Sequence, residues 1–338
     1  ITQGPVAKAL IRFAIPYLIS SLLQALYGAV DLFVVGQYAD SSAVSAVAIG
    51  SQVMQTITGI ILGISMGGTV LIGHCIGAGD HKKAADSVGT MAILFLIIAL
   101  VLTPLMLICT NGAVSLMQTP AESVQNTRSY IFICATGIPF IIGYNAVSGI
   151  FRGLGDSKTP TWFVGLACII NIAADFILVG GFHMGAAGAA LATILAQAVS
   201  FITALFYMYK KGFAFSFGKS NLRLNSSCAK SILKVGFPLA LQDGLVNISF
   251  LSITAIINTM GLIASAAVGV VEKIIIFAML PPSAFGSAVA TMTAQNIGAG
   301  KPKRAFSALK YGISFSLIFG IAICTYVQFQ PETLTRIF

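Results

Sequence analysis

The chain is short of charge, and shortest of acidic residues. Charged residues make up 9% of its 338 positions, only 10 side chains are acidic, and the mean hydropathy is +0.93. Because soluble domains carry charge at roughly a quarter of their positions, this chain has too little polar surface to cover a globule in water. The shortage of charge excludes a soluble protein and indicates a lipid environment.

Several functional signals are missing as well. The six cysteines are scattered without a CxxC pair, so we interpret them as small apolar residues. An HExxH motif and a pair of catalytic carboxylates are absent, which leaves an intramembrane enzyme as a weak alternative. The IGAG segments lack the GKS or GKT of a phosphate loop, and we expect no cofactor. Nucleic acid is not a predicted partner, because the basic residues lie in short loops.

Long apolar stretches are what the chain has in abundance. They exceed the roughly 20 residues that a helix needs to cross a bilayer, and they do not alternate as the strands of a barrel would. The sequence therefore predicts an all-α polytopic membrane protein. We expect nine transmembrane helices, near residues 10–36, 44–73, 87–109, 124–149, 159–182, 185–209, 231–259, 263–295 and 307–328.

The basic residues predict the orientation of these helices. All but three of the 19 Lys and Arg residues fall on one side of the proposed topology, and the exceptions are Arg128, Arg336 and Lys273. Since cytoplasmic loops carry the excess of Lys and Arg, this side is predicted to be cytoplasmic, together with the N-terminus. We expect a multi-pass protein of the plasma (inner) membrane.

An internal repeat organises the chain. Residues 76–79 read IGAG and recur at 297–300, a shift of 221, while Pro16 and Pro238 lie 222 residues apart. Six helices separate the copies, so both enter from the same side and form parallel repeats, as in transporters with two lobes. Two six-helix lobes make twelve helices, so we expect about three to be absent from this chain. The predicted first lobe is 1–209, the linker 210–230, and the partial second lobe 231–338.

These residues carry a resemblance to a known family. In order along the chain they are Pro16 and Asp31, segments 76–84 and 152–160, Asn171 with Asp175, and segment 295–300. Together they resemble the multidrug and toxic compound extrusion (MATE) family over the whole chain. The resemblance implies export of organic cations or other drugs in exchange for Na⁺ or H⁺.

A candidate ion site follows from charges at membrane depth, which are costly unless they face a cavity or a partner. Asp31 and Asp175 lie at similar distances from the outer ends of their helices, Asn171 is one turn below Asp175, and Thr193 falls in the same layer. Their oxygens suit Na⁺, and the carboxylates could instead take a proton. The resemblance also implies a cation site at these four positions. The alternative is that the acids reach water at the outer interface, while Asn171 and Thr193 bond between helices.

Two further groups of polar residues are candidates for a substrate cavity. Ser20, Gln24, Tyr27 and Asp31 form a polar stripe on the first helix, although helix-to-helix hydrogen bonds would explain Ser20 and Gln24 equally well. In the second lobe the candidates are Asp243, Asn247 and Glu272, or alternatively a structural ion pair with Lys273.

We interpret the chain as a secondary multidrug exporter in which two lobes rock about a central cavity, acting as a monomer on small-molecule drugs. A flippase for lipid-linked saccharides is the closest alternative. A flippase for such lipids would need a cationic cavity. The predicted spans instead hold four acids (Asp31, Asp175, Asp243, Glu272) and one base, Lys273, which favours a cationic cargo.

Overall fold

The computed structural model describes residues 1–258 and 262–329, and within them the side chains of 251, 254, 255, 258, 262–270, 272 and 273 lie outside the described set. The described part is helical and contains no strand. Short helical turns occur at Ala121–Ser123, Phe176–Gly181 and Lys219–Asn221. The long helices are α1 (Val6–Tyr38), α2 (Ser41–Gly77), α3 (His81–Leu116), α4 (Val124–Thr136), α5 (Ile138–Gly153), α6 (Lys158–Asp175), α7 (Gly185–Lys211), α8 (Ser226–Asn258), α9 (Leu262–Gly298) and α10 (Pro302–Phe329).

Each predicted span coincides with a helix or with two consecutive helical segments, which confirms an all-α polytopic fold. Seven described helices are long and apolar enough to cross a membrane, or eight if α4 and α5 form one span. α8 is continuous over 33 residues but is not among these seven. α1, α2, α3, α9 and α10 exceed the predicted spans at both ends, because hydropathy follows the hydrocarbon layer whereas the helices continue into the interfaces. Residue 259, the predicted end of the span 231–259, lies outside the described residues.

Two spans are less regular than a single apolar stretch suggests. The segment predicted as one helix over 124–149 bends by 48° between α4 and α5. Gly137 stands at this junction, and Pro139 follows in the first turn of α5, where its missing N–H costs little. The second break follows Asp175, where α6 passes into a π-helical segment, Phe176–Gly181. By contrast, α1 continues through Pro16, and α8 continues through Pro238.

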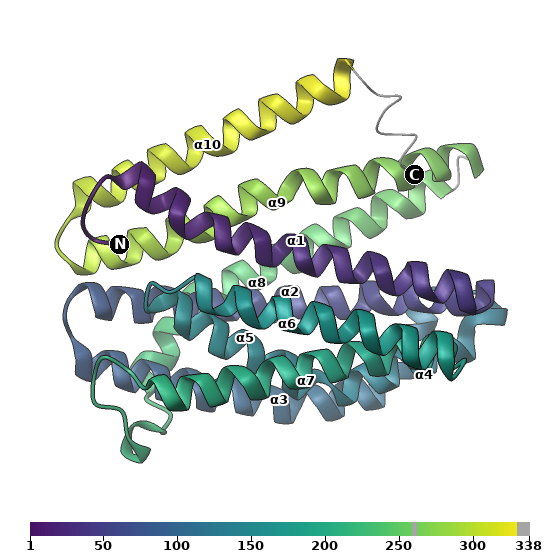
Figure 1. Cartoon of the computed structure of the whole chain (residues 1–338), viewed down its shortest axis with the longest axis horizontal. Helices are drawn as coiled ribbons and strands as arrows, with labels where there is room; N and C mark the ends of the chain where they lie inside the picture. Colours follow the sequence, from purple (N-terminus) through teal and green to yellow (C-terminus); the bar gives the residue numbers. More distant parts are fainter. Residues whose placement is uncertain (259–261, 330–338) are drawn as a thin grey trace.

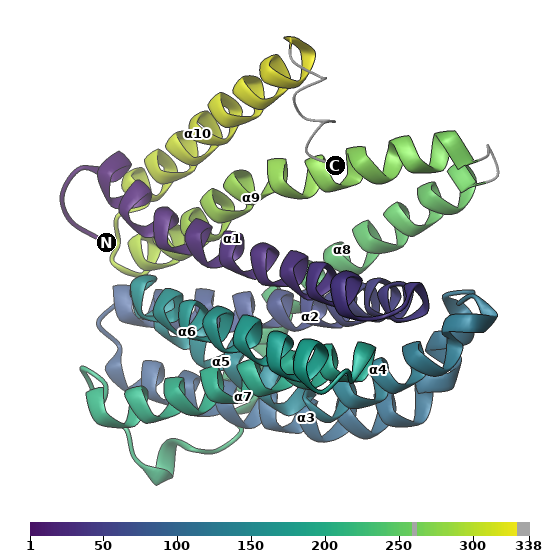
Figure 2. The ribbon, with the colours of Figure 1, turned by 45° about the vertical axis from the view of Figure 1, so that its right-hand side comes forward.

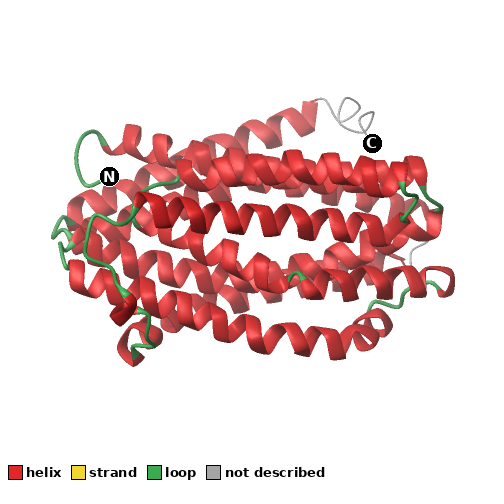
Figure 3. Cartoon of the chain, turned by 60° about the horizontal axis from the view of Figure 1, so that its bottom comes forward, coloured by secondary structure: helices red, strands yellow, loops and turns green. Residues whose placement is uncertain are grey.

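α1 joins the two parts of the molecule. Figures 1 and 2 show it lying between α6 on one side and α9 with α10 on the other. Its first turns pack Leu10 and Phe13 against Phe285 and Met292 of α9. Figure 3 shows all the long helices running along one direction, with loops gathered at the two ends.

One end of this bundle carries most of the basic loops, and we call it the basic end. It includes the α2–α3 and α9–α10 loops, which are the two IGAG segments of the repeat. A Cβ at Gly77 would collide with the backbone of Gln295, and a Cβ at Gly298 would collide with the backbone of His74. Because Gly298 and Gln295 lie 221 residues after Gly77 and His74, the contact is reciprocal. The two copies of the repeat therefore meet at the basic end in a pseudo-twofold arrangement.

Glycines on α2 continue this close approach toward the membrane centre. Gly63 lies against the backbone of Ala240, and Gly67 against the backbone of Ile232, so α2 and α8 pack without intervening side chains. At the opposite end α8, α9 and α10 diverge from the α2–α7 bundle (Figure 2). The molecule is thus closely packed at the basic end and splayed at the other.

Candidate functional site

Three helices bring the predicted ion-site residues together. Asp31 of α1 lies beside Asn171 and Asp175 of α6, and the hydroxyl of Thr193 on α7 donates to Asp31 Oδ2 at 3.2 Å. The helical spacing of four residues puts Asn171 and Asp175 on one face of α6. Two carboxylates, an amide and a hydroxyl therefore lie together between α1, α6 and α7.

These side chains are buried. Asp175 is 0%, Asn171 1% and Asp31 5% exposed, which differs from carboxylates that reach water at an outer interface. These side chains lie close to one another, but among the described residues no hydrogen bond of good geometry is made by either oxygen of Asp175, by Oδ1 of Asp31 or by the side-chain amide of Asn171. Buried polar atoms nearly always have a partner, so a cluster of unmet atoms marks the place of an ion, a proton or water. The donor set, mostly oxygen, fits Na⁺ or H⁺.

Two features of this site were not predicted. Gln197, one turn after Thr193 on α7, donates to the hydroxyl of Tyr27 at 3.4 Å, and so connects the polar stripe of α1 to α7. The spacing from Thr193 could have found it. The π-helical segment that follows Asp175 had no sequence signal, although such segments often occur at functional sites.

The polar stripe on α1 divides between two roles. The hydroxyl of Ser20 donates to Thr161 Oγ1 at 2.9 Å, and Thr161 donates to the carbonyl of Pro16 at 2.8 Å, so this part of the stripe joins α1 to α6. Gln24 is exposed, and Tyr27 is half-buried beside Asp31. Helix-to-helix bonding thus accounts for Ser20.

The candidates predicted for the second lobe lie where α8 packs on α2. Asp243 and Asn247 of α8 are half-buried and face Gly59 of α2, and the side chain of Asn247 donates to the carbonyl of Asp243 at 2.8 Å. They are separate from the site around Asp175. Glu272 and Lys273 fall in α9, but their side chains lie outside the described residues.

A GxSxG pattern in α2 has a structural explanation. Residues 63–67 read GISMG, which matches the sequence of a nucleophile elbow. Such an elbow is a strand-to-helix turn, whereas these residues lie within α2. The hydroxyl of Ser65 donates to the carbonyl of Asn145 at 2.8 Å and so joins α2 to α5.

The chain matches a known protein family over most of its length. The family model MatE matches residues 16–177 and 238–338, two segments that begin at the repeated prolines Pro16 and Pro238. The chain belongs to the MatE family. This is the multidrug and toxic compound extrusion family that the sequence resembles, and its members are membrane transporters rather than enzymes.

Individual MatE relatives agree with this assignment. The chain is 31% identical over 304 residues to the probable multidrug resistance protein YpnP of Bacillus subtilis, a match that covers 90% of this chain and 68% of YpnP. It is 24% identical to the multidrug export protein MepA of Staphylococcus haemolyticus, covering 99% of this chain and 74% of MepA.

Solved structures show the same fold. A MOP superfamily transporter from Pyrococcus furiosus superimposes with a TM-score of 0.93 at 24% identity, over 99% of this chain and 75% of that chain. The MatE fold is therefore present in this chain. Its family is one of multidrug efflux transporters, acting on small molecules at the plasma membrane.

Proposed function

We propose that this MatE chain exports small organic cations and other amphiphilic drugs in exchange for Na⁺ or H⁺, which binds at Asp31, Asn171, Asp175 and Thr193. The observation that carries the proposal is the cluster of buried polar atoms without partners that these residues form. Two adjacent carboxylates in a non-aqueous place repel each other, and a bound cation or proton removes that repulsion.

Coupling requires that the ion prefer one conformation. An ion with equal affinity for both states of a transporter would shift neither, however tightly it bound. The site spans α1, α6 and α7, so a change in the packing of α1 alters the distance between Asp31 and its partners on the other two helices. Because α1 also packs on α9, a change in the packing of α1 on ion binding would also alter its contact with the second lobe.

The two ends of the bundle suggest how access alternates. The basic end is closed by the reciprocal contact of Gly77 and Gly298, whereas the helices diverge at the other end. We place the basic end in the cytoplasm on the distribution of Lys and Arg, so this conformation would face outward. Rocking of residues 1–209 against 231–338 would separate the IGAG loops and admit drug from the cytoplasm.

The acidic charge at the contact of α2 and α8 favours a cationic drug as the cargo. Asp243 is half-buried between α2 and α8, at the contact of the two lobes, and offers a negative group to an organic cation there. Membrane-embedded acids favour a cationic drug over the anionic pyrophosphate of a lipid-linked saccharide. A flippase remains the alternative proposal, and it would work without either first-lobe carboxylate acting as an ion ligand.

The test is fluorescent-cation efflux from vesicles with Na⁺ and pH gradients imposed separately. For Asp31→Asn and Asp175→Asn we expect ion-driven efflux to fall at least about tenfold, since each loses a charged ligand. Thr193→Val should raise the ion concentration for half-maximal efflux about fivefold, the effect of one hydrogen-bonding oxygen, and Thr193→Ser should not.

Asp243→Asn serves as the matched control, because it removes a carboxylate outside the ion site. It should change which drugs are exported while ion-driven efflux of a neutral drug persists. Full ion-driven efflux in both Asp31→Asn and Asp175→Asn, at equal amounts of protein, would refute the site. Translocation of a labelled lipid-linked saccharide without any cation efflux would favour the flippase.

A further inference from the structure

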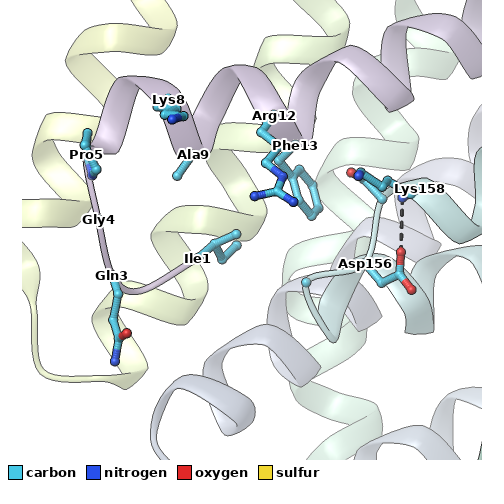
Figure 4. Close-up of a pocket in the computed structure, with 12 residues that line it drawn as sticks. Ile1, Gln3, Gly4, Pro5, Lys8, Ala9, Arg12, Phe13, Asp156 and Lys158 are labelled. Carbon is cyan, nitrogen blue, oxygen red and sulfur yellow. Dashed lines mark hydrogen bonds between the residues drawn. The ribbon is translucent and has the colours of Figure 1, made fainter.

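The basic end contains a pocket that the transport proposal does not use. It has a volume of about 570 Å³ and lies between the first turns of α1 and the loop that joins α5 to α6. Figure 4 shows Lys8 and Arg12 on α1, across the pocket from Asp156 and Lys158. One wall belongs to the chain segment before α1 and the other to the loop before α6, so the pocket lies at a junction of the molecule.

The segment before α1 is fixed to the second lobe. Arg304 donates to the backbone carbonyls of Ile1, Gln3 and Gly4, and Lys301 donates to the carbonyl of Thr2 at 3.0 Å. Both basic residues follow the second IGAG loop. A ligand in the pocket would therefore touch a segment held by the second lobe and a loop of the first.

The pocket has an excess of positive charge. The side chains of Lys8, Arg12 and Lys158 are exposed, and in the part of the chain that the structure describes none of them forms an ion pair. The acid in the pocket, Asp156, does not neutralise them. It pairs instead with a fourth cation, Lys211, at 3.0 Å.

The carboxylate of Asp156 also accepts hydrogen bonds from the first turn of α6. Its Oδ1 accepts the backbone N–H groups of Lys158 and Thr159, and its Oδ2 accepts the hydroxyl of Thr159 at 2.7 Å. Burial opposes ionisation of this carboxyl, but the bonds from Thr159 and the ammonium of Lys211 hold its pKa below the ordinary value. Asp156 is therefore a charged cap, and three cations remain without a counter-charge.

The surface next to the pocket is apolar and continuous with these cations. On α1 Lys8 and Arg12 are followed at helical spacing by Ile15 and Ile19, which are 48% and 45% exposed. Asp31 follows Ile19 by three full turns and a further third of a turn, so it projects from a different face of the helix. The face of α1 that carries the two cations is thus turned away from the ion site.

α6 repeats the pattern beside it. Lys158 is followed one turn later by Trp162, which is 79% exposed, and two turns further by Ile169, which is 69% exposed. Tryptophan is enriched where a membrane protein meets the headgroup layer. α1 and α6 are neighbours (Figure 1), so a lipid chain could lie along both stripes while its headgroup meets the cations above.

We propose that this pocket binds the phosphate of an anionic phospholipid, with Lys8, Arg12 and Lys158 around the headgroup and its acyl chains along Ile15, Ile19 and Trp162. Basic pockets between transmembrane helices are known as sites for anionic headgroups. The occupant is a lipid and not a free anion, because the apolar stripes lead directly from the cations. Its place between a segment held by the second lobe and a loop of the first stabilises the closed basic end.

Trp162 is the single tryptophan of the chain, and it provides the test. The full chain is reconstituted in phosphatidylcholine vesicles that contain a small fraction of brominated phosphatidylglycerol or brominated phosphatidylcholine, and quenching of Trp162 is compared. We expect the anionic lipid to be preferred about fivefold, which is the effect of roughly one effective basic contact near a membrane surface. The preference should disappear in the triple variant Lys8→Gln, Arg12→Gln and Lys158→Gln.

The matched control is Lys82→Gln with Lys83→Gln, which removes basic charge at the same end from α3. α3 packs on α2, α4, α5 and α8, so these changes leave the pocket intact, and the preference should persist. The proposal is overturned if both lipids quench equally in the wild type, or if the control loses as much preference as the triple variant, since attraction would then be diffuse. It is also overturned if millimolar inorganic phosphate removes the preference, because the pocket would then take a free anion. None of these outcomes depends on ion-driven transport.

Discussion

The two copies of the repeat have helices at equivalent positions, but the side chains along α1 and α8 differ in polarity. With the offset of 222 that relates Pro16 to Pro238, Asp31 of α1 corresponds to Ile253 of α8. Asp31 is 5% exposed and lies among oxygen atoms, whereas Ile253 is 49% exposed. Ser20 and Gln24 likewise correspond to Gln242 and Val246. The polar stripe of the first copy therefore has no continuous counterpart in the second.

This difference shows which properties the duplication retained. Close packing of helices depends on small residues at fixed positions, and Gly77 and Gly298 are kept in both copies. An ion site depends on several side chains from different helices, so a single exchange to Ile removes it. The close packing at the basic end is thus symmetric, while Asp31 of the proposed coupling site has an apolar residue, Ile253, as its counterpart.

Exchanging Asp31 and Ile253 should have the largest effect on transport. We expect Asp31→Ile to lower ion-driven efflux at least about a hundredfold, because it removes a charged ligand and leaves Asp175 without its partner. Ile253→Asp should not restore efflux in the double variant, since Ile253 lies on α8, which packs on α2, α3 and α9 and not on the helices that carry Asp175 and Thr193. Vesicle efflux under an imposed ion gradient measures both.

Recovered efflux in that double variant would show that a carboxylate at either copy suffices, and that the surrounding oxygens are dispensable. Asp31→Asn and Ile253→Asn, each alone, control for polarity without charge. The second of these should export normally.

The reciprocal contact at the basic end should make equivalent substitutions in the two copies equally costly. Gly77→Ala and Gly298→Ala should each destabilise the protein by roughly 1–3 kcal/mol, because the added Cβ meets backbone, which cannot move aside as a side chain can. The two values should agree within about 1 kcal/mol. Unfolding of the protein in detergent micelles by denaturant gives the free energies.

Gly28→Ala and Gly320→Ala are the controls, one in each copy. A Cβ added at either glycine would meet no atom within 4 Å, so alanine there should be neutral or stabilise the helix by up to about 1 kcal/mol. A large cost at Gly77 with none at Gly298 would contradict the pseudo-twofold contact.

Much of the fold could be predicted from the sequence, because apolar length and the 221-residue repeat are strong signals. The convergence of Asp31 with Asp175 also followed from counting residues along helices of known direction. The bend at Gly137 could not be predicted, since a straight helix and a bent one can have the same apolar sequence. Gln197 was missed because a polar residue in a helix has many explanations, and its contact with Tyr27 depends on how α7 rotates against α1.

The cluster of cations at the basic end could not be predicted from the sequence either. Lys8, Arg12 and Lys158 were interpreted only as markers of orientation, because they lie far apart in the sequence. Their meeting depends on the packing of α1 beside α6 and on Asp156, whose bonds to Thr159 and Lys211 were not apparent from composition. Counting charges predicts on which side of the membrane these residues lie, but it does not predict that they cluster there.

The residue that directly follows each IGAG segment differs between the two copies, and we expect its substitution to have the smallest effect. Gly79 and Gly300 have φ values of +71° and +68°, and they are followed by Asp80 and Lys301. Asp80 caps α3, since its Oδ1 accepts the N–H of Lys83 at 2.9 Å, whereas the Lys301 side chain bonds to the carbonyl of Thr2. Replacing Asp80 by Ala should cost about 1 kcal/mol, as for other lost N-caps.

Lys301→Asp would give α10 the cap that α3 has, at the loss of the bond to Thr2. We expect a net change within about 0.5 kcal/mol, because the gain of a cap and the loss of an exposed hydrogen bond are of similar size. Denaturant unfolding of both variants measures the pair, with Asp80→Asn as a control that keeps a capping oxygen. A cost at Lys301→Asp larger than that of Asp80→Ala would mean that the hold of Lys301 on the segment before α1 matters more to stability than either cap.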